Sequence, residues 1–305
     1  MTGESVLEGF KILKQDIFQT AKAVEKVMAT YLPFDKGEDQ PLFNAMAYAS
    51  LTNGKKLRPY LLWLVAQLYK VPFDQAMQVA SALEFVHCAS LIHDDLPCMD
   101  NADLRRGQPS CHKQFREDIA LLAGDSLLIL PYEILQNEKT HKDPCVRLDL
   151  IRALTQASGV KGIMLGQTMD ILSSENKTPS LDYTLKLSAL KTGSLLAFCC
   201  EAAAILGGAE KSDQKTLHEF GLKLGTLYQL VDDILDVEGT ASHLGKPINQ
   251  DVENNKNTFV SILGLEGARK YKKDLSQELS FLLKKLNKPT DKVQEFSLFL
   301  TTRTS

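Results

Sequence analysis

The sequence predicts an all-α protein that forms one large helical bundle. Apolar residues recur every three or four positions in six long segments, and no segment of similar length alternates apolar and polar residues as a half-buried strand would. Two stretches, 76–92 and 195–206, are apolar on nearly every side, which is typical of helices buried inside a bundle. The predicted helices cover residues 6–28, 73–93, 118–135, 147–171, 181–206 and 214–237.

The chain is predicted to be a single domain, residues 1–305. Hydrophobic residues make up 44% of the sequence, which is enough for a sizeable core. No Pro- or Ser-rich linker divides it, and the polar stretches 137–144, 173–179 and 239–257 are predicted to connect helices. The last of these is long for a connection, so we expect it to take part in function.

Charge and composition argue against several classes of protein. The formal net charge of -3 gives no sign of the basic face that nucleic-acid binding needs, so no nucleic-acid partner is expected. The six cysteines form no CxxC pair, which argues against a zinc site or a disulfide framework. Residues 1–10 hold no apolar run, and apolar runs such as 60–66 are too short to span a membrane. We therefore expect a cytoplasmic protein without a membrane span.

Two aspartate clusters are the strongest chemical signal in the chain. One runs from His93 to Asp100 and the other from Val231 to Asp236, each inside an otherwise apolar, helix-like stretch. Carboxylates without a counter-charge are very costly there, and their oxygens favour hard cations. Magnesium usually keeps some waters and bridges to the phosphates of a substrate. The clusters therefore predict magnesium-dependent chemistry on a diphosphate, whereas a solvated helix end is the commoner explanation for one such motif alone.

The spacing of the acids predicts how each cluster is built. On a helix, Asp232 and Asp236 are one turn apart, so both carboxylates project from the same face. In the first cluster Pro97 disfavours helical geometry at the residue before it. We therefore expect the helix to end or kink there, and Asp100 to return from a loop toward Asp94.

Basic residues occur in tight groups near both clusters, as a diphosphate site requires. One group follows a Gly turn and precedes Pro59, a residue suited to the first turn of a helix, where free N–H groups favour anions. Lys191 interrupts an apolar helix, which is a poor position for Lys unless something pairs with it. For any single residue, a solvated surface charge is the commoner explanation, so the argument depends on the joint pattern. The candidate cations are Lys55, Lys56, Arg58, Arg105, Arg106, Lys191, Lys246 and Lys256, and His87, two turns before Asp94, is expected to line the same cavity.

With these motifs the chain resembles the trans-polyprenyl diphosphate synthases, close to the farnesyl and geranylgeranyl diphosphate synthases of bacteria and plastids. The resemblance covers nearly the whole chain and implies the all-α isoprenoid synthase fold with a central cavity. The most specific stretches are SLIHDDLPCMD (90–100), RG (106–107), AGD (123–125), KTG (191–193), QLVDDILD (229–236), LGK (244–246) and LGLEGAR (263–269).

The resemblance implies a role for each candidate site residue. Three Mg²⁺ ions would bridge the allylic diphosphate, and the implied metal ligands are Asp94, Asp95, Asp100, Asp232 and Asp236. The same diphosphate would be bound by Arg105, Lys191 and Lys246, with Lys256 nearby. The second substrate, isopentenyl diphosphate, would be bound by Lys55, Arg58, His87 and Arg106. Thr192 and Gln229 would direct oxygen dipoles toward the allylic carbon as it becomes a cation.

The implied activity is elongation of C5, C10 or C15 allylic diphosphates with isopentenyl diphosphate, by ionisation, condensation and elimination. Ala89 stands five residues before Asp94, where farnesyl-forming relatives commonly carry an aromatic ring, and Pro97-Cys98 is an insertion in the acidic motif. Both features predict geranylgeranyl diphosphate (C20) over farnesyl diphosphate (C15). Two motifs depart from the family pattern, because Asn-Gly-Lys-Lys (53–56) replaces the usual Gly-Gly-Lys-Arg and Phe-Arg-Glu (115–117) replaces Phe-Gly-Glu. A homodimer is expected by analogy with the family.

Three alternatives remain open at this stage. A terpene cyclase would share the fold and the first cluster, but its second metal motif usually has a different composition and wider spacing. A non-catalytic subunit of a heteromeric synthase would tend to lose one acidic cluster. A metal phosphohydrolase could use His93 with Asp94, but further histidines at suitable spacing are lacking.

Overall fold

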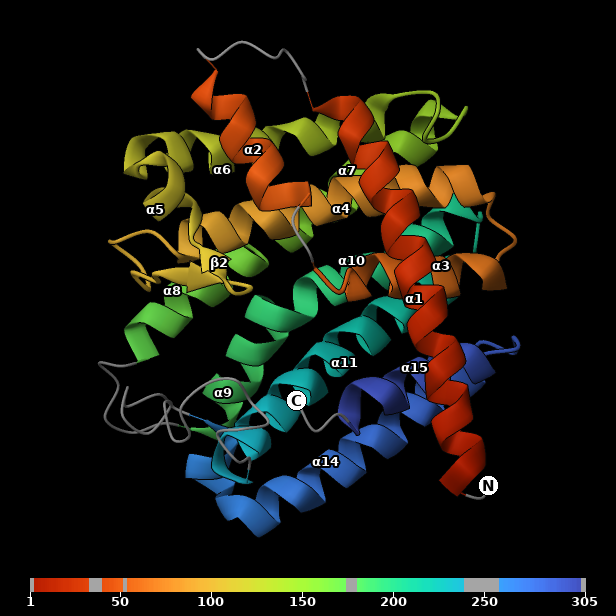
Figure 1. Ribbon diagram of the computed structural model, residues 1–305. Helices are drawn as coiled ribbons and strands as arrows, with labels where there is room; N and C mark the ends of the chain where they lie inside the picture. Colours follow the sequence, from red (N-terminus) through yellow and green to blue (C-terminus); the bar gives the residue numbers. More distant parts are fainter. Residues whose placement is uncertain (1–2, 33–39, 52–53, 174–179, 239–257, 303–305) are drawn as a thin grey trace. The chain divides into compact units, whose positions relative to one another are not determined.

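The computed structural model describes residues 3–32, 40–51, 54–173, 180–238 and 258–302, and these residues are almost wholly helical (Figure 1). The predicted all-α class is therefore confirmed. Contacts divide the chain into two compact units, Met1–Ile151 and Arg152–Ser305, called here the N-terminal and C-terminal units. That residues 1–305 form one domain stays a prediction.

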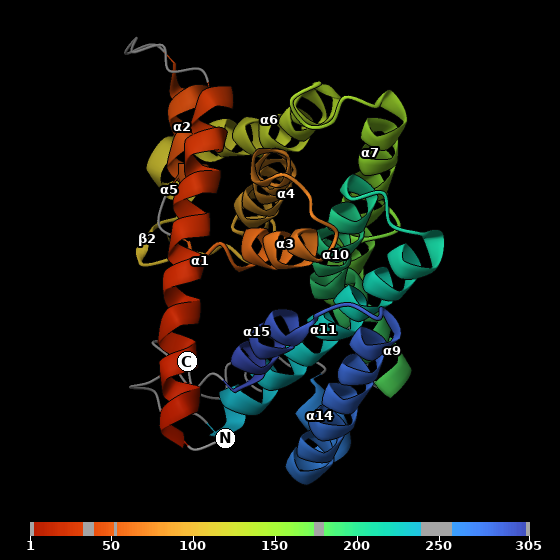
Figure 2. The same cartoon turned by 90° about the vertical axis from the view of Figure 1, so that its right-hand side faces the viewer.

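Helix α4 (Phe73–Asp94) forms the core of the N-terminal unit. Its side chains between Ala76 and Ile92 are buried on nearly every side, as the apolar pattern predicts. Figure 2 looks along α4, with α6 and α3 on either side, and α1 and α2 contact it as well. The other helices of this unit are α1 (Gly3–Tyr31), α2 (Pro41–Leu51), α3 (Leu57–Leu68), α5 (Cys111–Phe115), α6 (Glu117–Gln136) and the first part of α7 (Pro144–Ser158).

A short hairpin follows the first acidic cluster and contains the only strands among the described residues. Strand β1 (Leu104–Arg105) pairs antiparallel with β2 (Gln108–Pro109), and Arg105 lies opposite Gln108. The two residues of the turn, Arg106 (φ 54) and Gly107 (φ 76), both have positive φ, as a tight two-residue hairpin requires. At this turn, Arg105 contacts Asp95 and Arg106 contacts the chain at Gly54.

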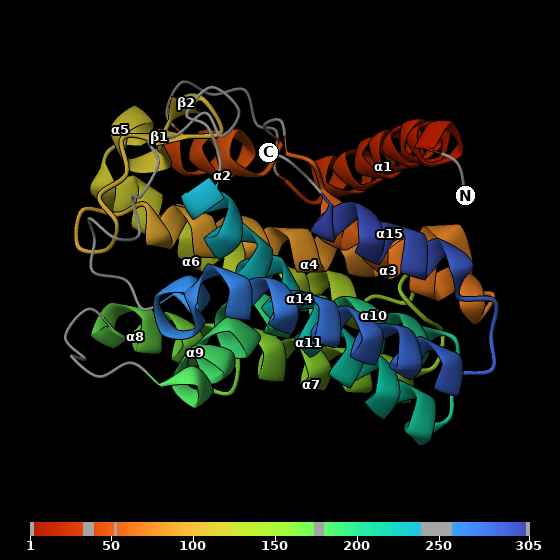
Figure 3. The same cartoon turned by 90° about the horizontal axis from the view of Figure 1, so that it is seen from below.

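Helix α11 (Lys211–Glu238) organises the C-terminal unit. It runs beside α10 (Ser194–Leu206) and α14 (Phe259–Lys285), as Figures 1 and 3 show. Two glycines allow a close approach on one side, because a Cβ at Gly221 would lie 2.4 Å from Ala197 Cα and a Cβ at Gly225 would lie 2.2 Å from Gly193 Cα. The remaining elements are the second part of α7, α8 (Ile163–Ser173), α9 (Leu181–Ser188), the π-helical turn η1 (Ala189–Gly193) and α15 (Asp291–Thr301).

Four of the six predicted helices are confirmed to within a few residues, as α1, α4, α6 and α11. The helix predicted at 147–171 is wrong, because the chain breaks between α7 and α8. A Cβ at Gly162 would lie 1.9 Å from the carbonyl oxygen of Ala157, so this tight break accepts only glycine at that position. The helix predicted at 181–206 is interrupted by the π-helical turn η1, and the sequence prediction did not include α2, α3, α5, α14 or α15.

One segment of the described chain is long and apolar enough to cross a membrane by length and composition alone. It is Leu181–Leu206, and 72% of its most apolar 18-residue window is buried inside the protein. A buried core helix passes the same test. Within the C-terminal unit this segment includes α10, whose residues are almost all buried against their neighbours.

Candidate active site

The first acidic cluster is a helix end followed by a loop that turns back on it. Helix α4 ends at Asp94, three residues before Pro97, as the sequence predicts. The N–H of Asp100 then donates to the carbonyl oxygen of Asp94 at 2.9 Å, and the N–H of Asn101 donates to that of Leu96 at 3.1 Å. The expected return of Asp100 toward Asp94 is therefore confirmed at the level of the backbone.

Asp95 differs from its neighbours because it is buried and bound by an arginine. Its two carboxylate oxygens accept from Arg105 Nε at 3.1 and 3.0 Å, and Arg105 Nη2 makes a further short contact with it. These hydrogen bonds raise the pKa of Arg105, and the charges of Asp94 and Asp100 add to the shift. Arg105 is therefore held beside the whole acidic cluster, with Asp95 as its anchor.

His93 is engaged with α6. Its Nε2 lies 3.3 Å from the carbonyl oxygen of Leu121 and 3.5 Å from Asp125 Oδ1. A Cβ at Gly124 would lie 2.2 Å from the same nitrogen, so the glycine makes room for the ring. The Ala-Gly-Asp motif (123–125) therefore provides space and a carboxylate for His93, which lies beside the first two aspartates of the cluster.

A cation cluster forms around His87 on α4. Arg58 Nη1 lies 3.2 Å from His87 Nε2. The Arg106 guanidinium lies against the chain at Gly54, where a Cβ would be 2.7 Å from Nη1, and Lys55 is exposed on the same turn. Burial, then the charges of Arg58, Arg106, Lys56 and Arg105, hold the pKa of His87 well below its usual value.

The cation cluster contains a hydrogen-bond donor that has no acceptor among the described residues. The Nε of Arg58 is buried and has no hydrogen-bond acceptor in that part of the chain. A buried N–H without an acceptor is costly, and an anionic ligand would satisfy it. His87 stays neutral in this field, so it accepts the hydrogen bond from Arg58 and leaves the arginine's remaining N–H groups for a ligand.

The second acidic cluster lies near the C-terminal end of α11. Asp232 and Asp236 are partly exposed and one turn apart, as predicted from their spacing. Asp233, between them, is buried, and protein groups occupy its carboxylate. Its carboxylate accepts from Gln229 Nε2 at 2.9 Å and from the N–H of Phe259, the first residue of α14, at 2.8 Å.

The π-helical turn η1 presents Lys191 and Thr192 to partners on two neighbouring helices. Lys191 Nζ lies 2.5 Å from Asp170 Oδ2 on α8, and the hydroxyl of Thr192 donates to Gln229 Oε1 on α11 at 3.4 Å. Glycines allow both approaches, because a Cβ at Gly166 would lie 2.4 Å from the backbone nitrogen of Lys191, and Gly225 touches Gly193. Asp170 lies one helical turn after Gly166, and Gln229 lies one turn after Gly225.

Asp170 is a candidate site residue that the sequence prediction missed. It lies on α8, at the end of the segment predicted as one continuous helix, and no motif marked it. The available signal was Lys191 itself, whose position in an apolar helix required an acidic partner. Lys246 and Lys256, also predicted to bind diphosphate, lie outside the described residues.

The acidic residues fit magnesium that arrives with a phosphate ligand. Within the described ranges, no group of three or more His, Cys, Asp or Glu side chains could hold a metal ion alone. The candidates come two to a cluster, Asp94 with Asp100 in the first and Asp232 with Asp236 in the second. Magnesium is usually bound by one or two carboxylates together with waters and the phosphates of a substrate, so pairs of this kind suit it.

Comparison with known proteins identifies the family. The polyprenyl synthetase family model matches residues 39–297. The chain belongs to this family. It is 39% identical to the farnesyl diphosphate synthase of Geobacillus stearothermophilus over 84% of this chain and 86% of that protein. It is 38% identical to the chloroplastic geranylgeranyl pyrophosphate synthase of Capsicum annuum, over 86% of this chain and 71% of that protein.

A solved structure of the family agrees with the fold of this polyprenyl synthetase. The geranyltransferase from Helicobacter pylori, in a complex with magnesium and isoprenyl diphosphate, matches with a TM-score of 0.78 and 31% identity. The match covers 93% of this chain and 94% of that chain. Prenyl synthases of the family use Mg²⁺, in agreement with the carboxylate pairs described above.

Proposed function

We propose that this short-chain trans-prenyltransferase condenses isopentenyl diphosphate with C5, C10 or C15 allylic diphosphates and releases diphosphate. The observation that carries the proposal is the cation cluster of Arg58, His87 and Arg106, with its buried N–H that has no acceptor among the described residues. An enzyme that condenses two diphosphate substrates needs a second diphosphate-binding group, distinct from the acidic clusters. An enzyme that ionises a single diphosphate substrate does not need this second group.

We propose that the two acidic clusters serve the same allylic diphosphate through three Mg²⁺ ions. Asp94 and Asp100 would be ligands from the first cluster, and Asp232 and Asp236 from the second. Asp95, also predicted as a ligand, has both oxygens in contact with Arg105, which supports a role in orienting that arginine toward the diphosphate. Bound Mg²⁺ would neutralise the charge that develops on the departing diphosphate.

The basic residues would hold the leaving group. Arg105 and Lys191 are each kept in position by a carboxylate, Asp95 and Asp170 respectively, which supports preorganised binding of an anion. Lys246 and Lys256 complete the proposed set. Because these charges are fixed before reaction, they favour scission of the C–O bond of the allylic diphosphate without a protein nucleophile.

Two oxygens would meet the allylic cation that forms. Thr192 and Gln229 share a hydrogen bond, and Asp233 holds the Gln229 amide nitrogen, so the amide oxygen is directed away from Asp233. Oxygen dipoles of this kind stabilise positive charge at the carbon that loses diphosphate. The double bond of isopentenyl diphosphate, held through Lys55, Arg58, His87 and Arg106, would then attack this carbon. The new bond leaves a cation that loses a proton to the released diphosphate.

We propose geranylgeranyl diphosphate as the main product. Ala89 is fully buried on α4, five residues before Asp94, and its methyl group leaves the position without an aromatic barrier. The relatives named above include both a farnesyl and a geranylgeranyl synthase at nearly equal identity, so the comparison does not choose between the two lengths.

The test is incubation of the purified chain with Mg²⁺, labelled isopentenyl diphosphate and each allylic starter separately, followed by product-length analysis. Linear C20 diphosphate is expected from every starter. A product that stops at C15 with excess isopentenyl diphosphate would refute the argument from Ala89. No incorporation by folded protein would refute elongation itself.

We also propose a homodimer that acts in the cytoplasm. The dimer is supported by analogy with the family alone. Light scattering should give about twice the mass of one chain, and a monomer at all concentrations would exclude it. Fractionation of cells should recover the protein with the cytosol, and recovery with membranes would exclude the proposed location.

A further inference from the structure

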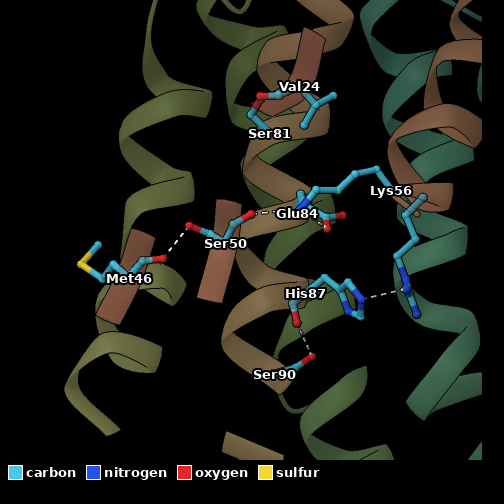
Figure 4. Close-up of polar contacts among 9 residues, drawn as sticks. Val24, Met46, Ser50, Lys56, Ser81, Glu84, His87 and Ser90 are labelled. Carbon is cyan, nitrogen blue, oxygen red and sulfur yellow. Dashed lines mark hydrogen bonds and ion pairs between the residues drawn. The ribbon is translucent and has the colours of Figure 1, made fainter. Parts of the chain in front are cut away.

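Lys56 is a buried lysine beside the cation cluster that the proposed mechanism does not use. Its exposed fraction is 3%, and that of Glu84 on α4 is 1%. Lys56 Nζ lies 3.0 Å from Glu84 Oε1 and also donates to the carbonyl oxygen of Ser50, near the end of α2, at 3.0 Å (Figure 4). One ammonium therefore joins the end of α2, the turn before α3 and the middle of α4.

The backbone at Lys56 shows why this turn needs an anchor. Its φ of 46° and ψ of 41° are left-handed, and it is the residue directly before α3. Residues with a side chain avoid this conformation, which persists only where the surrounding structure holds it. No side chain caps this end of α3. The buried ion pair of Lys56 is one contact that joins the turn to α4.

The same turn carries two residues of the cation cluster. Lys55 precedes Lys56 and is exposed, whereas Arg58 follows two residues later and meets His87. Glu84 and His87 are three residues apart on α4, so they lie on one face of that helix. The turn is thus joined to α4 by two neighbouring contacts. Lys56 meets Glu84 in the interior (Figure 4), and Arg58 meets His87 at the cluster.

We propose that Lys56 is a positioning residue for isopentenyl diphosphate. Its buried ion pair with Glu84 fixes the position of the turn along α4 and its orientation. The side chains of Lys55 and Arg58 are thereby directed at the diphosphate. This inference rests on the proposed function, because it assigns the cation cluster to that substrate. Lys56 is not placed to contact the ligand, since its ammonium is buried and lies against Glu84 and the carbonyl oxygen of Ser50.

The test compares Michaelis constants for the two substrates in variants of the pair. Lys56→Met leaves Glu84 as an unpaired buried charge and is expected to destabilise the protein, so the deciding variant is the double replacement Lys56→Met with Glu84→Leu. Apolar replacement of both partners of a buried ion pair commonly preserves stability. We expect the double variant to melt near the wild type while its KM for isopentenyl diphosphate rises about tenfold, because small misplacements of binding groups are costly. The KM for the allylic diphosphate should stay within about twofold.

Two further variants separate positioning from general effects. Lys56→Arg keeps the charge and restores the usual Gly-Gly-Lys-Arg ending, so it should retain the wild-type KM for both substrates. Lys223→Met removes a lysine from an exposed ion pair with Glu278 in the C-terminal unit, and neither KM should change. A double variant with the wild-type KM for isopentenyl diphosphate would overturn the proposal and leave the pair a stabilising role only.

A binding measurement distinguishes failure of this inference from failure of the proposed function. Inorganic diphosphate is titrated calorimetrically in the absence of Mg²⁺, with Arg58→Gln as the reference for a lost cluster. If the wild type binds diphosphate but performs no elongation, weaker binding by the double variant would still support positioning while the proposed function fails. If the wild type elongates and the double variant matches it in KM and in binding, the inference fails alone. Absence of both elongation and binding in the wild type overturns both.

Discussion

Asp233 links the second acidic cluster to the start of α14, and replacing it with asparagine should have two separable effects. Asp233 is 4% exposed, and its carboxylate accepts hydrogen bonds from Gln229 and from the N–H of Phe259. Asparagine has the same shape but one acceptor oxygen, so its NH₂ group must face one of the two donors. Helix α14 also loses the negative charge that lies at its N-terminus.

The size of the effect follows from these contacts. A hydrogen bond to a charged group contributes about 1.5–3 kcal/mol, and a negative charge at a helix N-terminus contributes about 0.3–1 kcal/mol. We therefore expect Asp233→Asn to cost about 3 kcal/mol, given one lost charged bond and the lost helix-end charge. At roughly 2–4 °C for each kcal/mol, the melting temperature should fall by roughly 6–12 °C.

Hydrogen exchange followed by mass spectrometry is the assay that locates the change. The peptide that begins α14, around Phe259, should lose protection, and calorimetry should show the lower melting temperature. Activity should fall as well, because the contact that orients the Gln229 amide loses the carboxylate charge. Asp274→Asn, at an exposed position on α14, is the matched control and should change none of the three. Unchanged melting and unchanged exchange at Phe259 in Asp233→Asn would refute the reasoning.

Three further predictions concern other residues of the site. Because the pKa of His87 is held well below its usual value, the unfolded chain takes up a proton below about pH 6.5 that the folded chain does not. Stability should therefore fall with decreasing pH by up to about 1.4 kcal/mol per unit, and this slope should shrink in His87→Gln when both are followed by urea unfolding. Ala89→Phe should shift the product from C20 to C15, as read by product-length analysis, and an unchanged C20 product would exclude Ala89 as a length determinant. Asp170→Asn should raise the KM for the allylic diphosphate about fivefold, because a partly buried ion pair that fixes Lys191 contributes about 1 kcal/mol. An equal rise in the KM for isopentenyl diphosphate would contradict the assignment of Lys191.

The helices that the sequence predicted are those with a sustained apolar face. Helix α4 was evident because its interior is apolar all round, whereas α14 alternates Lys, Glu and Asp with short apolar groups that blur its period. The break at Gly162 could not be read from periodicity, because the apolar residues on either side of it keep an approximate helical spacing. What decides the break is a contact between Gly162 and the Ala157 backbone, which is a property of the folded chain.

The site residues were predictable by type where they occur in groups, and less so where they act singly. The acid clusters and the paired arginines stood out as local groups of charge. Glu84 and Asp170 did not, because each is one carboxylate on a helix and its partner is distant in sequence. Glu84 carried a usable signal, since a lone charged residue in the apolar stretch of α4 requires a buried counter-charge.

The π-helical turn η1 has a consequence for how this part of the enzyme can be changed. A π turn holds one residue more than the α-helical turn it replaces, and each residue advances an α-helix by about 100°. Deleting one residue from Ala189–Gly193 would convert the turn to regular helix and rotate Lys191 and Thr192 relative to the apolar surface of α10. The number of residues in the turn therefore sets the orientation of Lys191 and Thr192. Side-chain substitutions leave this number unchanged, whereas a one-residue deletion changes it.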